Sequence, residues 1–151
     1  MATTKNNTIK LKFDSARNLA PAPESKSAAK IDPRYDLFIN GKFEKPQSKK
    51  YFDTINPATE EKLSEVAEAN QADVNKAVAA ARQAYDKGWK KTSPKERAKY
   101  IYRIARMIQE RAREFAVIET LDGGKPIRES RDFDVPTAAN HFFYYAGWAD
   151  K

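Results

Sequence analysis

The first regular pattern of apolar positions starts near residue 35 and is that of short β-strands. An apolar run at 37–39 ends at Asn40 and Gly41, and a second short run follows at 42–44. Asn-Gly between two such runs predicts a hairpin, because both residues tolerate a positive φ. Alternating apolar and polar positions predict two further strands, at 51–55 and 62–67.

Beyond residue 70 the apolar spacing changes to that of amphipathic helices. Asn70 is suited to cap the first helix, and Gly88 follows its last turn. Ser93, Pro94 and Glu96 form a capping box with proline at the first helical position, which predicts the start of a second, long helix. A stop at the glycines 123 and 124 ends it, and its length leaves room for a break near 109–113. The three predicted helices cover about 71–87, 94–121 and 134–151. The sequence thus predicts an α/β segment of short antiparallel strands followed by three amphipathic helices.

Residues 1–34 differ from the rest because they are polar and contain few apolar residues. Only Ile9, Leu11 and Phe13 alternate as in a strand. Such a segment buries too little apolar surface to offset the entropy of ordering it. We therefore expect a disordered or loosely docked tail at 1–34 and a structured part at 35–151.

The structured part has features of an incomplete domain. The third predicted helix shows no stop signal before Lys151, and the few short strands offer little sheet for three amphipathic helices to cover. We therefore expect further chain to complete the domain.

Composition narrows the classes of protein that fit. The 151 residues contain no cysteine, which excludes disulfides, thiolate metal sites and a cysteine nucleophile within this chain. No apolar run approaches the roughly 20 residues of a membrane span, and the N-terminus lacks the apolar core of a signal peptide. We expect a cytoplasmic protein that does not bind membranes.

The chain is basic, with 28 lysines and arginines against 21 acidic residues and a formal net charge of +7. Part of this charge forms a stripe on the second helix, opposite its predicted apolar face. The stripe has two interpretations: a surface that contacts nucleic-acid phosphates, or a face that is solvated or meets acidic residues elsewhere. No nucleic-acid-binding motif accompanies it, so nucleic acid is not the expected partner. The stripe consists of Lys95, Lys99, Arg103, Arg106 and Arg113.

Five sequence motifs from residue 37 onwards resemble the N-terminal segment of the aldehyde dehydrogenase family, in its order and at its spacing. The motifs are LFINGKF at 37–43, FDTINPAT at 52–59, DVNKAV at 73–78 with AAR at 80–82, ETLDGGKP at 119–126, and YYAGWADK at 144–151. The residues before 37 take no part in this resemblance.

The resemblance implies a Rossmann-like cofactor domain and an enzyme that oxidises an aldehyde to a carboxylic acid with NAD or NADP. In that family a cysteine thiolate attacks the carbonyl and a glutamate-activated water hydrolyses the thioester. Those residues and the cofactor-binding residues follow the segment that this chain matches. The resemblance therefore implies a truncated dehydrogenase that is inactive and binds no cofactor alone. Its implied partners are the remainder of the enzyme and, in the intact protein, identical subunits. The alternative is a free-standing interaction module that binds a protein or nucleic acid through its aromatic and basic helix faces.

One candidate site comes from the resemblance. Some family members bind a structural cation through backbone oxygens at positions matching Thr54 and Ile55, together with the acidic residue matching Asp122. A carboxylate is a suitable ligand for an alkali or alkaline-earth ion. The alternative is that Asp122 is simply the turn residue before two glycines. The single histidine, His141, has no neighbouring cysteine or histidine and makes a poor metal site.

Overall fold

The computed structural model describes residues 26–151, and the part of the predicted tail at 1–25 lies outside the described residues. The strands are β1 (Arg34–Tyr35), β2 (Leu37–Ile39), β3 (Lys42–Glu44), β4 (Tyr51–Ile55) and β5 (Lys62–Ala67). The helices are α1 (Gln71–Lys87), α2 (Pro94–Glu110), α3 (Ala112–Gly123), α4 (Ile127–Glu129) and α5 (Val135–Ala146). Two short 3-10 turns, η2 (Lys26–Ala28) and η3 (Trp89–Lys91), and a π-helical turn, η4 (Ser130–Asp134), complete the described elements.

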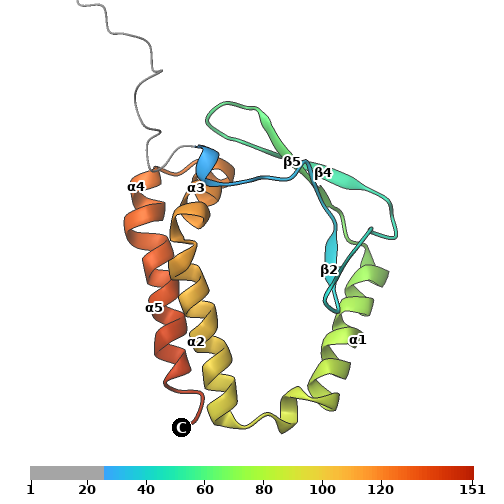
Figure 1. Ribbon diagram of the computed structural model, residues 1–151. Coiled ribbons are helices and arrows are strands. Elements are labelled where there is room, and N and C mark those ends of the chain that lie inside the picture. The colour runs from blue at the N-terminus through green and yellow to red at the C-terminus, as the bar shows by residue number, and fades with distance from the viewer. Residues whose placement is uncertain (1–25) are drawn as a thin grey trace, which may run out of the picture.

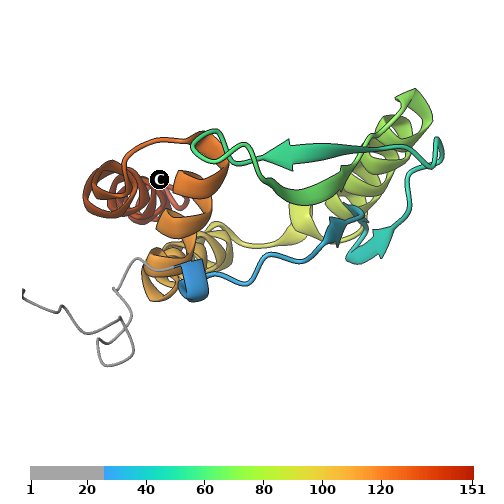
Figure 2. The same ribbon diagram turned by 90° about the horizontal axis from the view of Figure 1, so that it is seen from above.

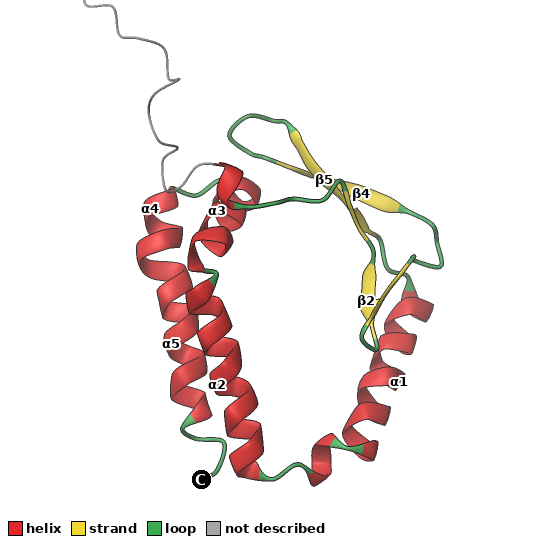
Figure 3. Ribbon diagram, in the orientation of Figure 1, coloured by secondary structure: helices red, strands yellow, loops and turns green. Residues whose placement is uncertain are grey.

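The elements form an arch. Helices α2 and α5 pack side by side along one leg, α1 forms the other leg, and the strands span the distance between them (Figures 1 and 2). Strands precede helices along the chain, as predicted for this α/β segment (Figure 3).

The predicted hairpin is present as strands β2 and β3. Asn40 and Gly41 take φ values of 53° and 77°, the positive values that a two-residue hairpin turn of this kind requires. The register places Phe38 opposite Phe43, and their ring centroids lie 5.1 Å apart. Both rings are exposed, so this cross-strand pair stabilises the hairpin without joining a core.

The second sheet has the strand order β1-β5-β4. Strands β4 and β5 are antiparallel, as predicted, but β1 was missed and pairs with β5 in parallel. Arg34 and Tyr35 lie opposite Glu65 and Val66 in this pairing. Sequence analysis missed β1 because a strand of two residues is too short to show an alternating pattern. It forms only by pairing with a strand about thirty residues further along the chain.

Helix α1 begins at a reciprocal cap. The Asn70 side chain accepts a hydrogen bond from the Asp73 backbone N–H at 3.0 Å, and the Asp73 carboxylate accepts from the Asn70 N–H at 3.0 Å. The same carboxylate accepts the Gln47 N–H at 3.2 Å on both oxygens. Asp73 is only 3% exposed. This one side chain therefore fixes the start of α1 and ties it to the segment that follows β3.

The long second helix is broken where its length suggested. Ser93 caps α2, and its Oγ accepts the Glu96 N–H at 3.3 Å. The helix ends at Arg111, whose φ of −106° and ψ of 17° leave the helical region. Helix α3 starts at the next residue and ends at Gly124, which has a φ of 70° and donates its N–H to the Thr120 carbonyl oxygen.

The last predicted helix is confirmed at its start and wrong at its end. Helix α5 begins at Val135, as predicted, but it ends at Ala146 with Gly147 as its C-cap. The short elements α4 and η4 lead into it without a break. Pro136 explains the π-helical turn: it has no N–H and its ring crowds the carbonyl four residues earlier, so the helix widens by a residue there.

The buried core is small and consists largely of alanines and short aliphatic residues. Ala105 and Ala139 are 0% and 1% exposed, where α2 and α5 pack together. Large apolar residues remain outside it: Val78 on α1 is 62% exposed and Phe43 is 69% exposed. No helix among residues 26–151 is long and apolar enough to cross a membrane.

The cap of α1 gives a direct test of this fold. Replacing Asp73 by Ala leaves two backbone N–H groups, those of Asn70 and Gln47, without their acceptor, so we expect the free energy of unfolding to fall by about 1–3 kcal/mol. Urea denaturation followed by circular dichroism measures it. The control is Asn75→Ala in the same helix, whose exposed side chain bonds only to that of Gln71; a loss of equal size there would contradict the assignment.

Candidate functional site

The predicted cation-binding residues lie at the ends of two neighbouring elements, the strand β4 and the helix α3. Thr54 and Ile55 end strand β4, and Asp122 lies exposed in the last turn of α3. A Cβ added at Gly124 would lie 3.0 Å from the Cβ of Pro57, so the end of α3 meets the turn after β4. Among residues 26–151, no group of three histidine, aspartate or glutamate side chains gathers in a metal-binding arrangement. The cation site stays a prediction, and the turn interpretation of Asp122 agrees with the left-handed cap at Gly124.

The segment 119–126 forms a junction between α3 and the last helix. The Lys125 ammonium donates to Glu119 at 3.2 Å and also to Asp134. The hydrogen bonds to Asp134 and then Glu119 raise the pKa of Lys125 above its usual value. Beside this pair, the Thr120 hydroxyl donates to that of Ser130 at 3.1 Å, and Ser130 is fully buried. The motif's polar residues therefore hold the π-helical turn against α3.

The acidic residues of the last helical segment lie at different places in it. Glu129 is in the first turn of α4, and Asp132 and Asp134 belong to η4. Asp134 binds Lys125, and Asp132 accepts from the neighbouring Arg131 guanidinium at 2.6 Å. His141 lies exposed on α5. The sequence did not predict the two ion pairs of Lys125, because their acidic partners belong to the helical segments before and after it.

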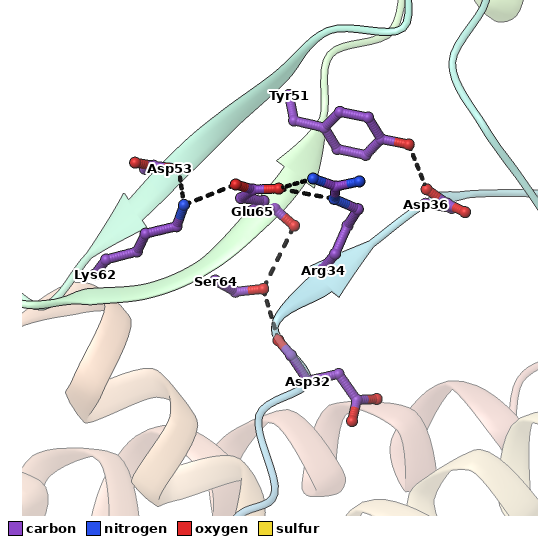
Figure 4. A network of polar contacts seen from close by, with 8 residues as sticks. All are labelled: Asp32, Arg34, Asp36, Tyr51, Asp53, Lys62, Ser64 and Glu65. Carbon is purple, nitrogen blue, oxygen red and sulfur yellow. Dashed lines mark hydrogen bonds and ion pairs between the residues drawn. The ribbon is translucent and has the colours of Figure 1, made fainter.

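A network of polar side chains joins β1, β5 and β4 (Figure 4). Arg34 Nε donates to Glu65 Oε2 at 2.7 Å, and Lys62 Nζ donates to Glu65 Oε1 at 2.8 Å. Lys62 also lies 2.7 Å from Asp53 Oδ1. Hydrogen bonds from Lys62 and Arg34 hold the pKa of Glu65 below its usual value, and the bond to Glu65 raises the pKa of Arg34. Glu65 is thus the acceptor on which both cations converge.

Two further bonds in Figure 4 fasten the residues on either side of β1. The Ser64 hydroxyl donates to the Asp32 carbonyl oxygen at 2.7 Å, and the Tyr51 hydroxyl donates to Asp36 at 2.6 Å. The bond to Asp36 raises the pKa of Tyr51. The Arg34 guanidinium also covers the Tyr51 ring at 4.4 Å. The described part of the predicted tail, residues 26–34, is therefore docked by specific contacts with the sheet.

A groove of ≈560 Å³ lies between α2 and α5, and sequence reasoning missed it because each helix supplies only one wall. The Tyr102 and Phe143 rings, which both line the groove, meet edge-on with centroids 5.0 Å apart. Three cations of the predicted basic stripe line it together with small residues. The stripe therefore borders an apolar surface and does not lie wholly opposite one; Arg106, by contrast, pairs with Glu110 at 3.3 Å. The lining residues are Lys95, Ala98, Lys99, Tyr102, Arg103, Phe143, Ala146 and Gly147.

The glycine turn after α3 does not have the geometry of a phosphate-binding turn. The two consecutive glycines lie at the C-terminal end of α3, where the helix dipole is negative and repels phosphate. The Gly124 N–H, which would have to face a phosphate, already donates to Thr120.

Comparison with known proteins assigns the chain to a family. Residues 43–151 match the aldehyde dehydrogenase family. An aldehyde dehydrogenase of Alternaria alternata is 45% identical over 115 residues, which are 76% of this chain and 23% of that protein. The mitochondrial aldehyde dehydrogenase family 2 member B4 of Arabidopsis thaliana is 45% identical over 116 residues, again 76% of this chain and 22% of that protein.

Solved structures agree. The NAD+ complex of the Bacillus cereus aldehyde dehydrogenase is 41% identical to this chain and superimposes with a TM-score of 0.75, covering 78% of this chain and 24% of that one. This chain belongs to the aldehyde dehydrogenase family and matches the N-terminal part of its structures. It spans about a quarter of the length of the relatives it matches. The expected family and fold class are confirmed; the cytoplasmic location stays a prediction, and one relative is named as mitochondrial.

The Glu65 network predicts a pH-dependent loss of stability. Because its pKa is lowered by folding, Glu65 stabilises the protein above the ordinary glutamate pKa of about 4.3, and this contribution disappears as the pH falls through the lower folded value. Glu65→Gln should therefore be less stable than the parent protein near neutral pH, and the difference should vanish in acid. Thermal melts of both proteins at neutral pH and at acidic pH measure this difference in stability.

Glu68→Gln is the matched control, since Glu68 lies exposed just beyond β5. A stability difference for Glu65→Gln that persists unchanged in acid would show that charge plays no part in it.

The junction after α3 gives a paired glycine test. Gly124→Ala places a side chain at a φ of 70° and 3.0 Å from Pro57, so we expect a loss of about 1–3 kcal/mol in stability. Gly123→Ala meets nothing within 4 Å and should change stability by less than about 1 kcal/mol, in the favourable direction. Chemical denaturation compares the two, and equal effects would contradict the proposed contact.

Proposed function

We propose that this chain is the leading part of an NAD(P)-dependent aldehyde dehydrogenase, which oxidises an aldehyde to a carboxylic acid. The observation that carries the proposal is the match of residues 43–151 to the family, supported by the likeness to a 41% identical enzyme solved as its NAD+ complex. The proposal assigns the oxidation to the complete enzyme and a supporting role to these residues.

Exposed apolar faces support that role. On α1, Val74, Val78 and Tyr85 recur at helical spacing and are 47%, 62% and 44% exposed. On the opposite leg of the arch, Phe115 is also exposed and lies beside an apolar hollow of ≈420 Å³ between α3 and α5. Surfaces of this kind mark interaction sites in soluble proteins. We infer that the remainder of the dehydrogenase, including its cofactor-domain sheet, covers them.

The chemistry itself requires residues beyond these. The thiolate nucleophile implied by the family is missing, since the 151 residues contain no cysteine. The position of the glycine turn at the negative, C-terminal end of α3 supports the view that it does not hold a pyrophosphate. We therefore propose that the chain alone neither oxidises aldehydes nor binds the cofactor.

A graft separates the two parts of this proposal. Residues 43–151 replace the matching segment of the Bacillus cereus enzyme, and aldehyde-dependent NADH formation is followed by absorbance. We expect the graft to form NADH, because the host supplies the nucleophile and the cofactor site, and we expect none from the 151-residue chain.

Two controls make the outcome decisive. The host enzyme without this segment should be inactive, which shows that the segment is required. A graft carrying Asp73→Ala should lose stability more than activity, since Asp73 caps α1. Turnover by the purified 151-residue chain, or a folded graft unable to bind NAD+, would overturn the proposal.

A further inference from the structure

The groove between α2 and α5 has two chemically different walls. Lys95, Lys99 and Arg103 follow one another along about two turns of α2 and are exposed. The wall from α5 is formed by Phe143, Ala146 and Gly147 and carries no charge. An occupant matched to it would be apolar on one side and negatively charged on the other.

The three cations are not explained by ion pairing within the described chain. None of them makes an ion pair with a carboxylate among residues 26–151, and Arg103 meets only the Tyr100 ring, at 5.9 Å. Elsewhere on the helices, Lys90 pairs with Asp86 at 3.2 Å and Arg111 with Glu114 at 2.7 Å. The groove thus holds three cations that form no ion pair with the described residues.

Helix stability does not account for the charge either. Lys95 lies in the first turn of α2, where the helix dipole disfavours a cation. Glu96 already supplies the favourable acidic residue of that turn. A lysine at position 95 therefore costs α2 some stability and gains nothing from the chain around it.

We propose that this groove binds an acidic amphipathic helix, whose apolar side chains rest on Tyr102 and Phe143 and whose carboxylates meet the three cations. Charge complementarity selects this occupant, and a groove between two helices suits a third helix laid along it. The proposal concerns a binding surface and does not depend on dehydrogenase activity.

The aromatic pair in the groove argues against a nucleic acid as its occupant. Bases stack on open aromatic faces, whereas the Tyr102 and Phe143 rings pack edge-on against each other at an interplanar angle of 65°. The cations also occupy one wall only, where a nucleic-acid strand would be flanked by charge along its backbone. A peptide with separate apolar and acidic faces fits both observations.

The test uses the full 151-residue chain and a labelled synthetic peptide of about 15 residues, with Leu and Phe on one helical face and Glu on the next. Fluorescence anisotropy should show saturable binding that weakens as salt rises from about 0.05 to 0.5 M. A peptide with Lys in place of Glu should not bind measurably.

Charge-reversal variants locate the site. Lys99→Glu should weaken binding about fivefold or more, and Lys95→Glu should do so while favouring α2 through its dipole, so loss of folding cannot mimic the result. The matched control is Lys45→Glu, an exposed lysine after β3 with the same change in net charge. Circular dichroism checks that each variant keeps its helices.

The outcomes separate the proposal from its rivals. Equal binding by Lys99→Glu and Lys45→Glu would overturn it, because the peptide would then bind another exposed apolar face. Tighter binding of a single-stranded oligonucleotide or of anionic lipid vesicles than of the acidic peptide would overturn it as well and would reassign the basic stripe.

Discussion

The packing of α2 against α5 through alanines is the interaction on which the rest of the described structure depends. Ala105 and Ala139 have almost no exposed surface, and their small side chains let the two helices approach closely. The close approach orients the basic residues of α2 and the apolar residues of α5 towards a shared groove. It also fixes the last helix against α3, where Lys125 and Ser130 complete the contact. A larger residue at either alanine would separate the two helices, and both the groove and the contact of the last helix with α3 would be lost.

Local sequence features were enough to predict the elements that local interactions form. The hairpin at Asn40 and Gly41, the cap at Asn70 and the break near Arg111 each depend on a few consecutive residues. Prediction failed where structure depends on distant partners. Strand β1 exists through β5, and the unpredicted turn η4 is held against α3 by the bond between Thr120 and Ser130. The end at Gly147 was missed although the glycine itself was readable, because the apolar spacing continued past it.

The candidate sites also have a part that the sequence predicted and a part that it could not predict. The family and fold class could be predicted because five motifs occur along the chain in the order that the family has, and comparison confirms both. The motif at 119–126 could be recognised in the sequence, but the structural reason for its composition could not. Its lysine and threonine bind Asp134 and Ser130 of the following helical segment, and its second glycine passes close to Pro57. The groove could not be predicted at all, since α2 alone shows a basic stripe without revealing what lies beside it.

The parallel pairing of β1 with β5 also constrains the order in which the chain folds. Arg34 meets Glu65 only after a loop of about thirty residues has closed, and closing such a loop carries an entropic cost that adjacent pairings avoid. The hairpin and the helices involve near neighbours and form quickly. During synthesis, β1 leaves the ribosome before β5, and it can become ordered in the sheet only after β5 has emerged. The strand at the beginning of the described chain is therefore among the last to take its place.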